Sequence, residues 1–205
     1  MIGVAAGVLG AVAVVGEAAG HPAAVVPLVV GVAAVASFFR DPERRPPAGP
    51  GRVVSPADGR VVAVVPERED RFLAAPATRI SIFMSPLNVH VNRNPIDATV
   101  ALVRHTPGRF RAAFADKASL DNERNAVVLE AGTRRYLMVQ IAGALARRIV
   151  WRVPTGTRVR RGERCGLIMF GSRVDLFVPP DVKPVVKRGD RVRAGITIVA
   201  EEPGA

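Results

Sequence analysis

The chain has 205 residues, of which 49% are hydrophobic, so it can form one sizeable domain with an appendage or two small domains. Its formal net charge of +11 favours an anionic partner such as a membrane surface or an acidic metabolite. Only 5% of the residues are aromatic, with one Trp and one Tyr, which leaves little surface for stacking bases and argues against a nucleic-acid binder.

The first 39 residues form two apolar stretches, 2–16 and 22–39, which are separated by Glu17, Gly20 and His21, and they contain no Lys or Arg. Their second half, Pro22–Phe39, has about the length of a helix that spans a thin bilayer. Arg40, Arg44 and Arg45 follow, which by the positive-inside tendency places the rest of the chain on the cytoplasmic side. We therefore expect residues 1–39 to anchor the chain in the cell membrane, as a hairpin or as one span with a re-entrant segment. Two buried core helices are the alternative.

A connector and a β domain follow the expected anchor. Residues 40–51 contain four prolines and two glycines, which stop a helix and mark a domain boundary. Over residues 52–205, short β-branched runs alternate with turn residues, which predicts a mainly β fold: a sandwich- or barrel-like antiparallel domain with one helical insert at Arg109–Ser119. The expected strands are Val53–Val54, Arg60–Val65, Arg79–Met84, Val89–Val91, Thr99–Val103, Ala126–Leu129, Tyr136–Ile141, Ile149–Val153, Leu167–Phe170 and Val174–Val178.

Two segments of the β domain, Val159–Gly166 and Val186–Val192, share the order apolar, basic, basic, Gly, acidic, basic. A third turn followed by a strand stands at Ser55–Val61. Such turn–strand units are similar to those of lipoyl or biotinyl carrier domains. Those carriers present a Lys at the hairpin tip, and the corresponding positions here hold none. The repeat therefore informs the fold and not the function.

Three polar positions are candidates for chemistry on the residues alone. Asp58 precedes Gly59, a pattern typical of a turn. Strand alternation puts His90 and Asn92 on one face, which suits a general acid or base as well as a structural histidine. His105, before a Thr-Pro-Gly turn, is another candidate. No His pair at metal spacing and no phosphate-binding glycine loop is present, so we expect no metal site.

The Gly171–Ser172 pair is an unusual feature of the C-terminal region. It interrupts two apolar β runs, where a glycine weakens a strand, so it is either a tight connection or a place where the backbone itself reacts. The single cysteine, Cys165, excludes an internal disulfide, and its apolar neighbours favour a small core residue over a nucleophile.

Together, the ordered motifs of the chain resemble the short form of the pyruvoyl-dependent phosphatidylserine decarboxylases. No single motif is specific, but the set covers nearly the whole chain in the family's order. The segments are Phe38–Pro42, Ser55–Gly59, Met84–Arg93, His105–Gly108, Asp116–Ser119, Asn122–Asn125, Gln140–Gly143, Gly162–Gly166 and Phe170–Arg173.

The resemblance implies a role for the Gly171–Ser172 bond. In such enzymes the proenzyme cuts itself there: the Ser172 hydroxyl attacks the Gly171 carbonyl, an ester forms, and elimination and loss of ammonia leave a pyruvoyl group at residue 172. The products are a β chain of residues 1–171 and an α chain of residues 172–205. The pyruvoyl ketone, in place of pyridoxal phosphate, then forms a Schiff base with the serine amine and accepts electrons as carbon dioxide leaves.

The resemblance also assigns residues one by one. Asp58 matches the aspartate that assists self-cleavage, and His90 matches the histidine linked to decarboxylation. Arg93 stands where the family's motif has a second histidine. Three ways of activating Ser172 follow: His90 serves both steps, His105 substitutes, or the strained bond needs little help. Arg93, Asn92, Asn122 and His105 are candidate substrate contacts.

The expected function is decarboxylation of membrane phosphatidylserine to phosphatidylethanolamine by a cytoplasmic-side domain. Two rivals stay open, namely a membrane-anchored β adaptor without catalysis and a pyruvoyl decarboxylase of another substrate. The sequence also leaves open whether the chain forms a homo-oligomer.

Overall fold

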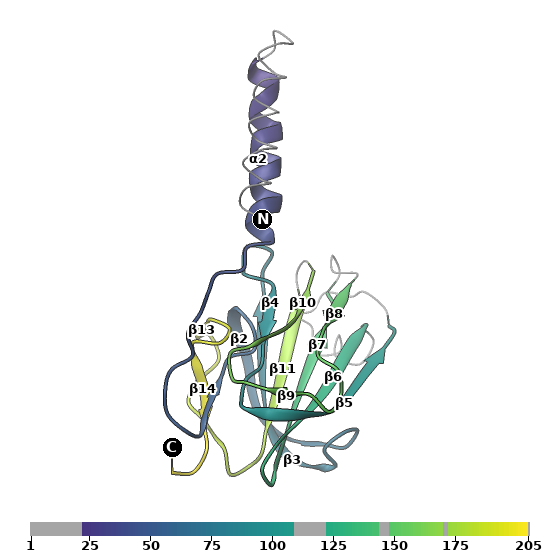
Figure 1. Cartoon of the computed structure of the whole chain (residues 1–205), viewed down its shortest axis with the longest axis vertical. Helices are drawn as coiled ribbons and strands as arrows, with labels where there is room; N and C mark the ends of the chain where they lie inside the picture. The colour runs from purple at the N-terminus through teal and green to yellow at the C-terminus, as the bar shows by residue number, and fades with distance from the viewer. Residues whose placement is uncertain (1–21, 109–121, 144–147, 170–171, 205) are drawn as a thin grey trace. The chain divides into compact units, whose positions relative to one another are not determined.

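A computed structural model describes residues 22–108, 122–143, 148–169 and 172–204 (Figure 1). The chain divides into two compact units, Met1–Asp41 and Pro42–Ala205. The second unit begins within the predicted connector. The predicted helical insert at Arg109–Ser119 lies outside the described residues, as does Gly171.

Helix α2, Pro22–Phe38, has 17 residues and no charged side chain. After it ends, Arg40 Nη1 donates hydrogen bonds to the Ser37 carbonyl (2.7 Å) and hydroxyl (3.0 Å), which places a cation at the negative end of the helix dipole. In the part of the chain that the structure describes, no helix combines the length and apolar character needed to cross a membrane. The predicted membrane span is therefore not supported. A helix of 17 residues is about 26 Å long, against about 30 Å for a typical hydrocarbon core.

The second unit is built from strands, and the strand pairs within its described residues are antiparallel, which confirms the prediction of a mainly β, antiparallel fold. Eight strands form one sheet in the order β13-β2-β3-β11-β7-β6-β5-β9, and two small sheets have the orders β1-β14-β12 and β4-β10-β8. The strands are β1 (Arg52–Val54), β2 (Gly59–Glu69), β3 (Ala75–Met84), β4 (Val91–Arg93), β5 (Ala98–Thr106), β6 (Arg124–Ala131), β7 (Arg134–Ile141), β8 (Ile149–Trp151), β9 (Arg158–Val159), β10 (Arg164–Ile168), β11 (Ser172–Val178), β12 (Lys183–Pro184), β13 (Arg191–Val192) and β14 (Ile198–Glu201).

Strand β11 lies inside the large sheet, between β3 and β7 (Figure 1). All seven of its residues are buried. Val174, Leu176 and Val178 belong to the large apolar core, whereas Phe177 belongs to a smaller cluster on the other face. Burial of each such side chain contributes about 1.5–3 kcal/mol. Because side chains alternate along a strand, Ser172 lies on the large-core face.

The register places Ser172 at one end of this sheet. Ser172 pairs with Met84 of β3, and the next residue, Arg173, pairs with Phe83 of β3 and Ile141 of β7. The loop after Met84 and the segment after Ile141 therefore both leave the sheet beside Ser172.

Candidate active site

Ser172 is the fully buried first residue of β11. Its hydroxyl points to the sulfur of Met84, with an Oγ–Sδ distance of 3.4 Å. A thioether is a weak hydrogen-bond acceptor, so this contact holds the hydroxyl only loosely. The position is compatible with a nucleophile.

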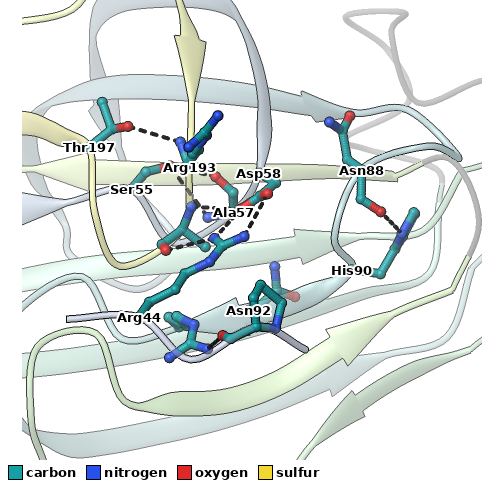
Figure 2. A network of polar contacts seen from close by, with 12 residues as sticks. Arg44, Ser55, Ala57, Asp58, Asn88, His90, Asn92, Arg193 and Thr197 are labelled. Carbon is teal, nitrogen blue, oxygen red and sulfur yellow. Dashed lines mark hydrogen bonds and ion pairs between the residues drawn. The ribbon is translucent and has the colours of Figure 1, made fainter. Parts of the chain in front are cut away.

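His90 is positioned by the loop that follows Met84. Asn88 Oδ1 accepts hydrogen bonds from both the backbone N–H and the hydroxyl of Ser85, each at 2.8 Å, which closes a tight turn. The Asn88 carbonyl lies 2.9 Å from His90 Nδ1 (Figure 2). Because a carbonyl only accepts, Nδ1 carries the proton, and Nε2 carries the lone pair in the neutral ring.

The backbone of His90 also approaches the strand that leads to the Gly-Ser pair. The His90 carbonyl accepts a hydrogen bond from Ile168 N, at 3.3 Å. Ile168 ends β10, three residues before Gly171. His90 thus lies beside β10, the strand whose end leads to residue 171, and it follows Met84, the last residue of β3, by six positions.

Three buried amide side chains form a hydrogen-bonded row on the Ser172 face of the sheet. Asn125 Nδ2 donates to Gln140 Oε1 at 3.0 Å, and Gln140 Nε2 donates to Asn92 Oδ1 at 2.9 Å. Asn92 Nδ2 donates to the Pro56 carbonyl at 3.3 Å and lies 3.8 Å from Met84 Sδ. Asn92, a predicted contact, is therefore brought close to Ser172 through Met84.

Asp58 has a different environment. Both of its carboxylate oxygens bind the guanidinium of Arg44, with an Nη2–Oδ2 distance of 2.9 Å, and Oδ1 also accepts from Ala194 N at 2.8 Å (Figure 2). The side chains of Arg44 and Asp58 are 7% and 11% exposed. Strand β3 separates β2 from β11, so Gly59 lies about two strand spacings, ~10 Å, from Ser172. The described contacts make Asp58 an anchor of the turn at residues 55–59.

Arg93 is buried and bridges two backbone segments. Its Nη1 donates to the Gly162 carbonyl at 2.9 Å and its Nη2 to the Pro42 carbonyl at 3.0 Å. Strand alternation places Arg93 on the opposite face of β4 from Asn92. The structure therefore does not bring this guanidinium to Ser172.

The two remaining candidates lie on the β6 side of the sheet. Asn122 Nδ2 donates to the Ala142 carbonyl at 2.7 Å, and Ala142 follows the residue that pairs with Arg173, so Asn122 lies near the same end of the sheet. His105 is half exposed, and its Nε2 lies 3.6 Å from Glu123 Oε1. His105 is on β5, where it pairs with Asn125 of β6, and β5 is three strands away from β11.

Sequence reasoning did not single out Gln140, Asn125 or Arg44 as site residues. Tyr136 and Met138 point into the large core from alternate positions of β7, and Gln140 is the next position in this series. Asn125 stands at the corresponding inward position of β6, two residues before the core residue Val127. A polar residue at an inward strand position is a signal that could have identified both amides. Arg44 lies in the connector, where the sequence carries no such signal.

Cys165 belongs to the large core, and burial raises the pKa of its thiol despite the opposing effect of the Arg93 cation. It therefore stays a neutral thiol, in agreement with the prediction of a core residue. Within the described ranges, no group of three His, Cys, Asp or Glu side chains is arranged to hold a metal ion.

Comparison with known proteins identifies the family. Residues 32–200 match the family model described as phosphatidylserine decarboxylase. A relative from Oleidesulfovibrio alaskensis named "Phosphatidylserine decarboxylase proenzyme" is 52% identical over 164 residues, or 80% of this chain and 75% of the relative. Relatives of the same name from Streptomyces coelicolor and Ruegeria pomeroyi are each 50% identical, over 85% and 80% of this chain and 76% and 77% of their own lengths. The chain therefore belongs to the phosphatidylserine decarboxylase family.

Proposed function

We propose that the chain is the proenzyme of a phosphatidylserine decarboxylase, which releases carbon dioxide from the serine headgroup and leaves phosphatidylethanolamine. The family match supports this activity, and its relatives are named proenzymes. The structural observation that carries the proposal is the placement of Ser172: a buried serine at the first position of a central strand, with its hydroxyl against a weak acceptor.

In the proposed cut, Ser172 Oγ attacks the carbonyl carbon of Gly171. The peptide C–N bond breaks and the freed nitrogen takes a proton, so an ester joins the two residues. Removal of the Cα proton of residue 172 breaks the ester C–O bond, which leaves a Gly171 carboxylate and dehydroalanine. Water then replaces the nitrogen, ammonia leaves, and residue 172 becomes a pyruvoyl group. The products are chains 1–171 and 172–205.

The residues around Ser172 fit such a group. A pyruvoyl carbonyl needs hydrogen-bond donors, and Asn92 Nδ2 already lies against Met84 Sδ, the atom that the Ser172 hydroxyl contacts. When formed, the pyruvoyl ketone supplies an electron sink for the loss of carbon dioxide. Asn92 is therefore the proposed contact for the group at residue 172.

His90 is the proposed proton carrier. The Asn88 carbonyl fixes the tautomer of its ring, so that Nε2 can take the proton of Ser172 and later hold a proton for the substrate carbon. His90 is preferred over His105, because His105 is half exposed, lies beside Glu123 and sits on β5, three strands from β11. Arg93 is not needed as a base in this proposal.

Asp58 assists the cut indirectly in this proposal. Its ion pair with Arg44 holds the turn at residues 55–59, and the carbonyl of Pro56 in that turn binds Asn92. Asn122 and Arg93 hold backbone carbonyls, so their proposed contribution is to the shape of the substrate site.

The finer fold assignment belongs to the same proposal. The two repeated turns carry Gly162 and Gly189, which have φ values of 77° and 100°. The shared left-handed glycine supports lipoyl-like turn–strand units, because a side chain is strained in that conformation.

We place the enzyme at the cytoplasmic side of the cell membrane, where a diacyl substrate resides. The net charge of +11 supports attraction to a surface rich in anionic lipid. Residues 1–39 are apolar and suit contact with that surface.

The test compares the wild-type chain with Ser172→Ala and with Ser81→Ala, a control that removes another buried serine hydroxyl, on β3. Intact mass should show chains 1–171 and 172–205 for the wild type and Ser81→Ala, and one uncut chain for Ser172→Ala. Vesicles containing phosphatidylserine should yield carbon dioxide and phosphatidylethanolamine only with the cut proteins, and hydroxylamine should trap a carbonyl at residue 172. An uncut wild type without carbonyl reactivity would favour a non-catalytic adaptor, and a cut, trappable protein inert toward phosphatidylserine would favour another substrate.

A further inference from the structure

The row Asn125–Gln140–Asn92 has a fixed direction. The Pro56 carbonyl can only accept, so Asn92 must turn its Nδ2 toward Pro56 and its Oδ1 toward Gln140. Gln140 must then present Nε2 to Asn92 and Oε1 to Asn125. All three side chains are at most 2% exposed, so water does not offer an alternative partner. Each amide in the row therefore polarises the next in the same sense.

The donor end of this row and the Ser172 hydroxyl both contact the sulfur of Met84. Asn92 carries two N–H groups on Nδ2; one accounts for the bond to Pro56, and the atom also lies 3.8 Å from Met84 Sδ. The Ser172 hydroxyl contacts the same sulfur at 3.4 Å. A sulfur atom is a poor acceptor for a buried amide donor, whereas a carbonyl oxygen is a good one.

We propose that Gln140, held by Asn125, is a positioning residue that keeps the donor N–H of Asn92 directed at residue 172. This inference rests on the proposed function, because it assigns the Asn92 N–H a role in the cut at residue 172. The N–H stabilises the oxygen that gains negative charge when Ser172 attacks the Gly171 carbonyl, and afterwards binds the carbonyl at residue 172. Gln140 itself touches neither group. Its bond to Asn92 Oδ1 acts together with the Pro56 carbonyl, and both select the same orientation of the Asn92 amide.

Two substitutions separate positioning from packing. Gln140→Leu removes the amide at similar volume. Gln140→Glu keeps the shape and the acceptor for Asn125, but an ionised carboxylate repels Asn92 Oδ1, so the Asn92 amide should rotate and withdraw its donor. When the carboxyl is protonated it can again donate to Asn92 Oδ1, so the original orientation should return.

The readout is the rate at which newly translated chain is cut into 1–171 and 172–205, followed by gel after a cell-free pulse and chase. Gln140→Leu should cut roughly 10- to 100-fold more slowly than wild type at every pH. The Gln140→Glu rate, divided by the wild-type rate, should rise as pH falls from about 8 to about 5, because burial raises the pKa of a carboxyl into this range. Tyr136→Phe is the matched control, since it removes a partly buried hydrogen bond to Glu202 from the same face of β7, four residues from Gln140.

The Tyr136→Phe control should be cut at the wild-type rate even if its melting temperature is lower than that of the wild type. The proposal is overturned if Gln140→Leu and Gln140→Glu both cut like wild type, or if all three variants slow only in proportion to their loss of melting temperature. It is also overturned if the relative rate of Gln140→Glu does not change with pH. A failure of the proposed function looks different, because then the wild-type chain itself stays uncut.

Discussion

Arg173 and Asp175, two residues apart on β11, form a two-point ion pair in which each side chain is only 2% exposed. The Nε–Oδ1 and Nη2–Oδ2 distances are 2.8 and 2.7 Å. The pair lies on the face of β11 opposite Ser172. The strand that begins at Ser172 is therefore held by apolar packing on one face, and by this ion pair together with the apolar packing of Phe177 on the other.

Removal of one partner of the Arg173–Asp175 ion pair should lower the free energy of unfolding. Asp175→Ala leaves the Arg173 guanidinium buried without its counter-ion, and we expect the free energy of unfolding to fall by about 3–5 kcal/mol. Urea unfolding should be measured in a Ser172→Ala background, where the chain is expected to stay whole.

The double variant Arg173→Met, Asp175→Leu is the control for this prediction. Because it removes both charges and keeps apolar volume, it should be far more stable than Asp175→Ala and close to the parent. A loss of less than about 1 kcal/mol in Asp175→Ala would mean that water or a neighbouring group replaces Asp175 at the guanidinium.

The ion pair of Arg44 and Asp58 makes a separate prediction about self-cleavage. If Asp58 acts by holding the turn at residues 55–59, Arg44→Met should slow the cut nearly as much as Asp58→Asn does, although it leaves the carboxylate in place. Arg45→Met, a change at an exposed neighbour, should have no effect. A wild-type rate in Arg44→Met, together with a stalled Asp58→Asn, would instead assign Asp58 a direct part in proton transfer.

Most strands could be predicted because Val- and Ile-rich runs alternate with turn residues. The ends of β2 and β3 could not. Their hairpin continues to the pair Glu69 and Ala75, beyond the apolar runs, because backbone pairing extends through polar residues that sequence patterns assign to a loop. The stretch Pro22–Phe39 was interpreted as a membrane span on composition, but the described helix ends at Phe38 and falls short of a span.

The site was only partly predictable for a related reason. Ser172 and His90 belong to short motifs that can be read locally. The bonds from Gln140 to Asn92 and from Arg93 to Gly162 join residues 48 and 69 positions apart. Such contacts depend on strand register, and a slip of one residue would turn Gln140 to the other face of the sheet.

Gly59 should not tolerate a side chain. A Cβ added there would lie 2.0 Å from the Phe83 carbonyl oxygen, a backbone atom of β3 beside Met84. We expect Gly59→Ala to lower the free energy of unfolding by about 1–3 kcal/mol or more, since backbone must move. Gly31→Ala is the control, because no atom lies within 4 Å of its added Cβ. Equal melting temperatures for Gly59→Ala and the parent would contradict the close packing of β2 on β3.

Cys165 should make stability depend on alkaline pH. Burial, opposed by the Arg93 cation, raises the pKa of this thiol in the folded chain. The raised pKa of the Cys165 thiol therefore contributes fully to the free energy of unfolding below the unfolded pKa of about 8.5. This contribution is lost progressively as pH rises toward the pKa in the folded chain. Above about pH 8.5 the free energy of unfolding should fall by close to ~1.4 kcal/mol per pH unit from this one proton.

Urea unfolding of Ser172→Ala chains at several pH values, with and without Cys165→Ala, isolates the effect of the thiol, because the two chains share every other titrating group. Cys165→Ala should lower stability at neutral pH through the lost packing, yet show the shallower decline above pH ~8.5. Parallel declines would show that the thiol ionises as readily in the folded chain as in the unfolded one, and would contradict its placement in the dry core.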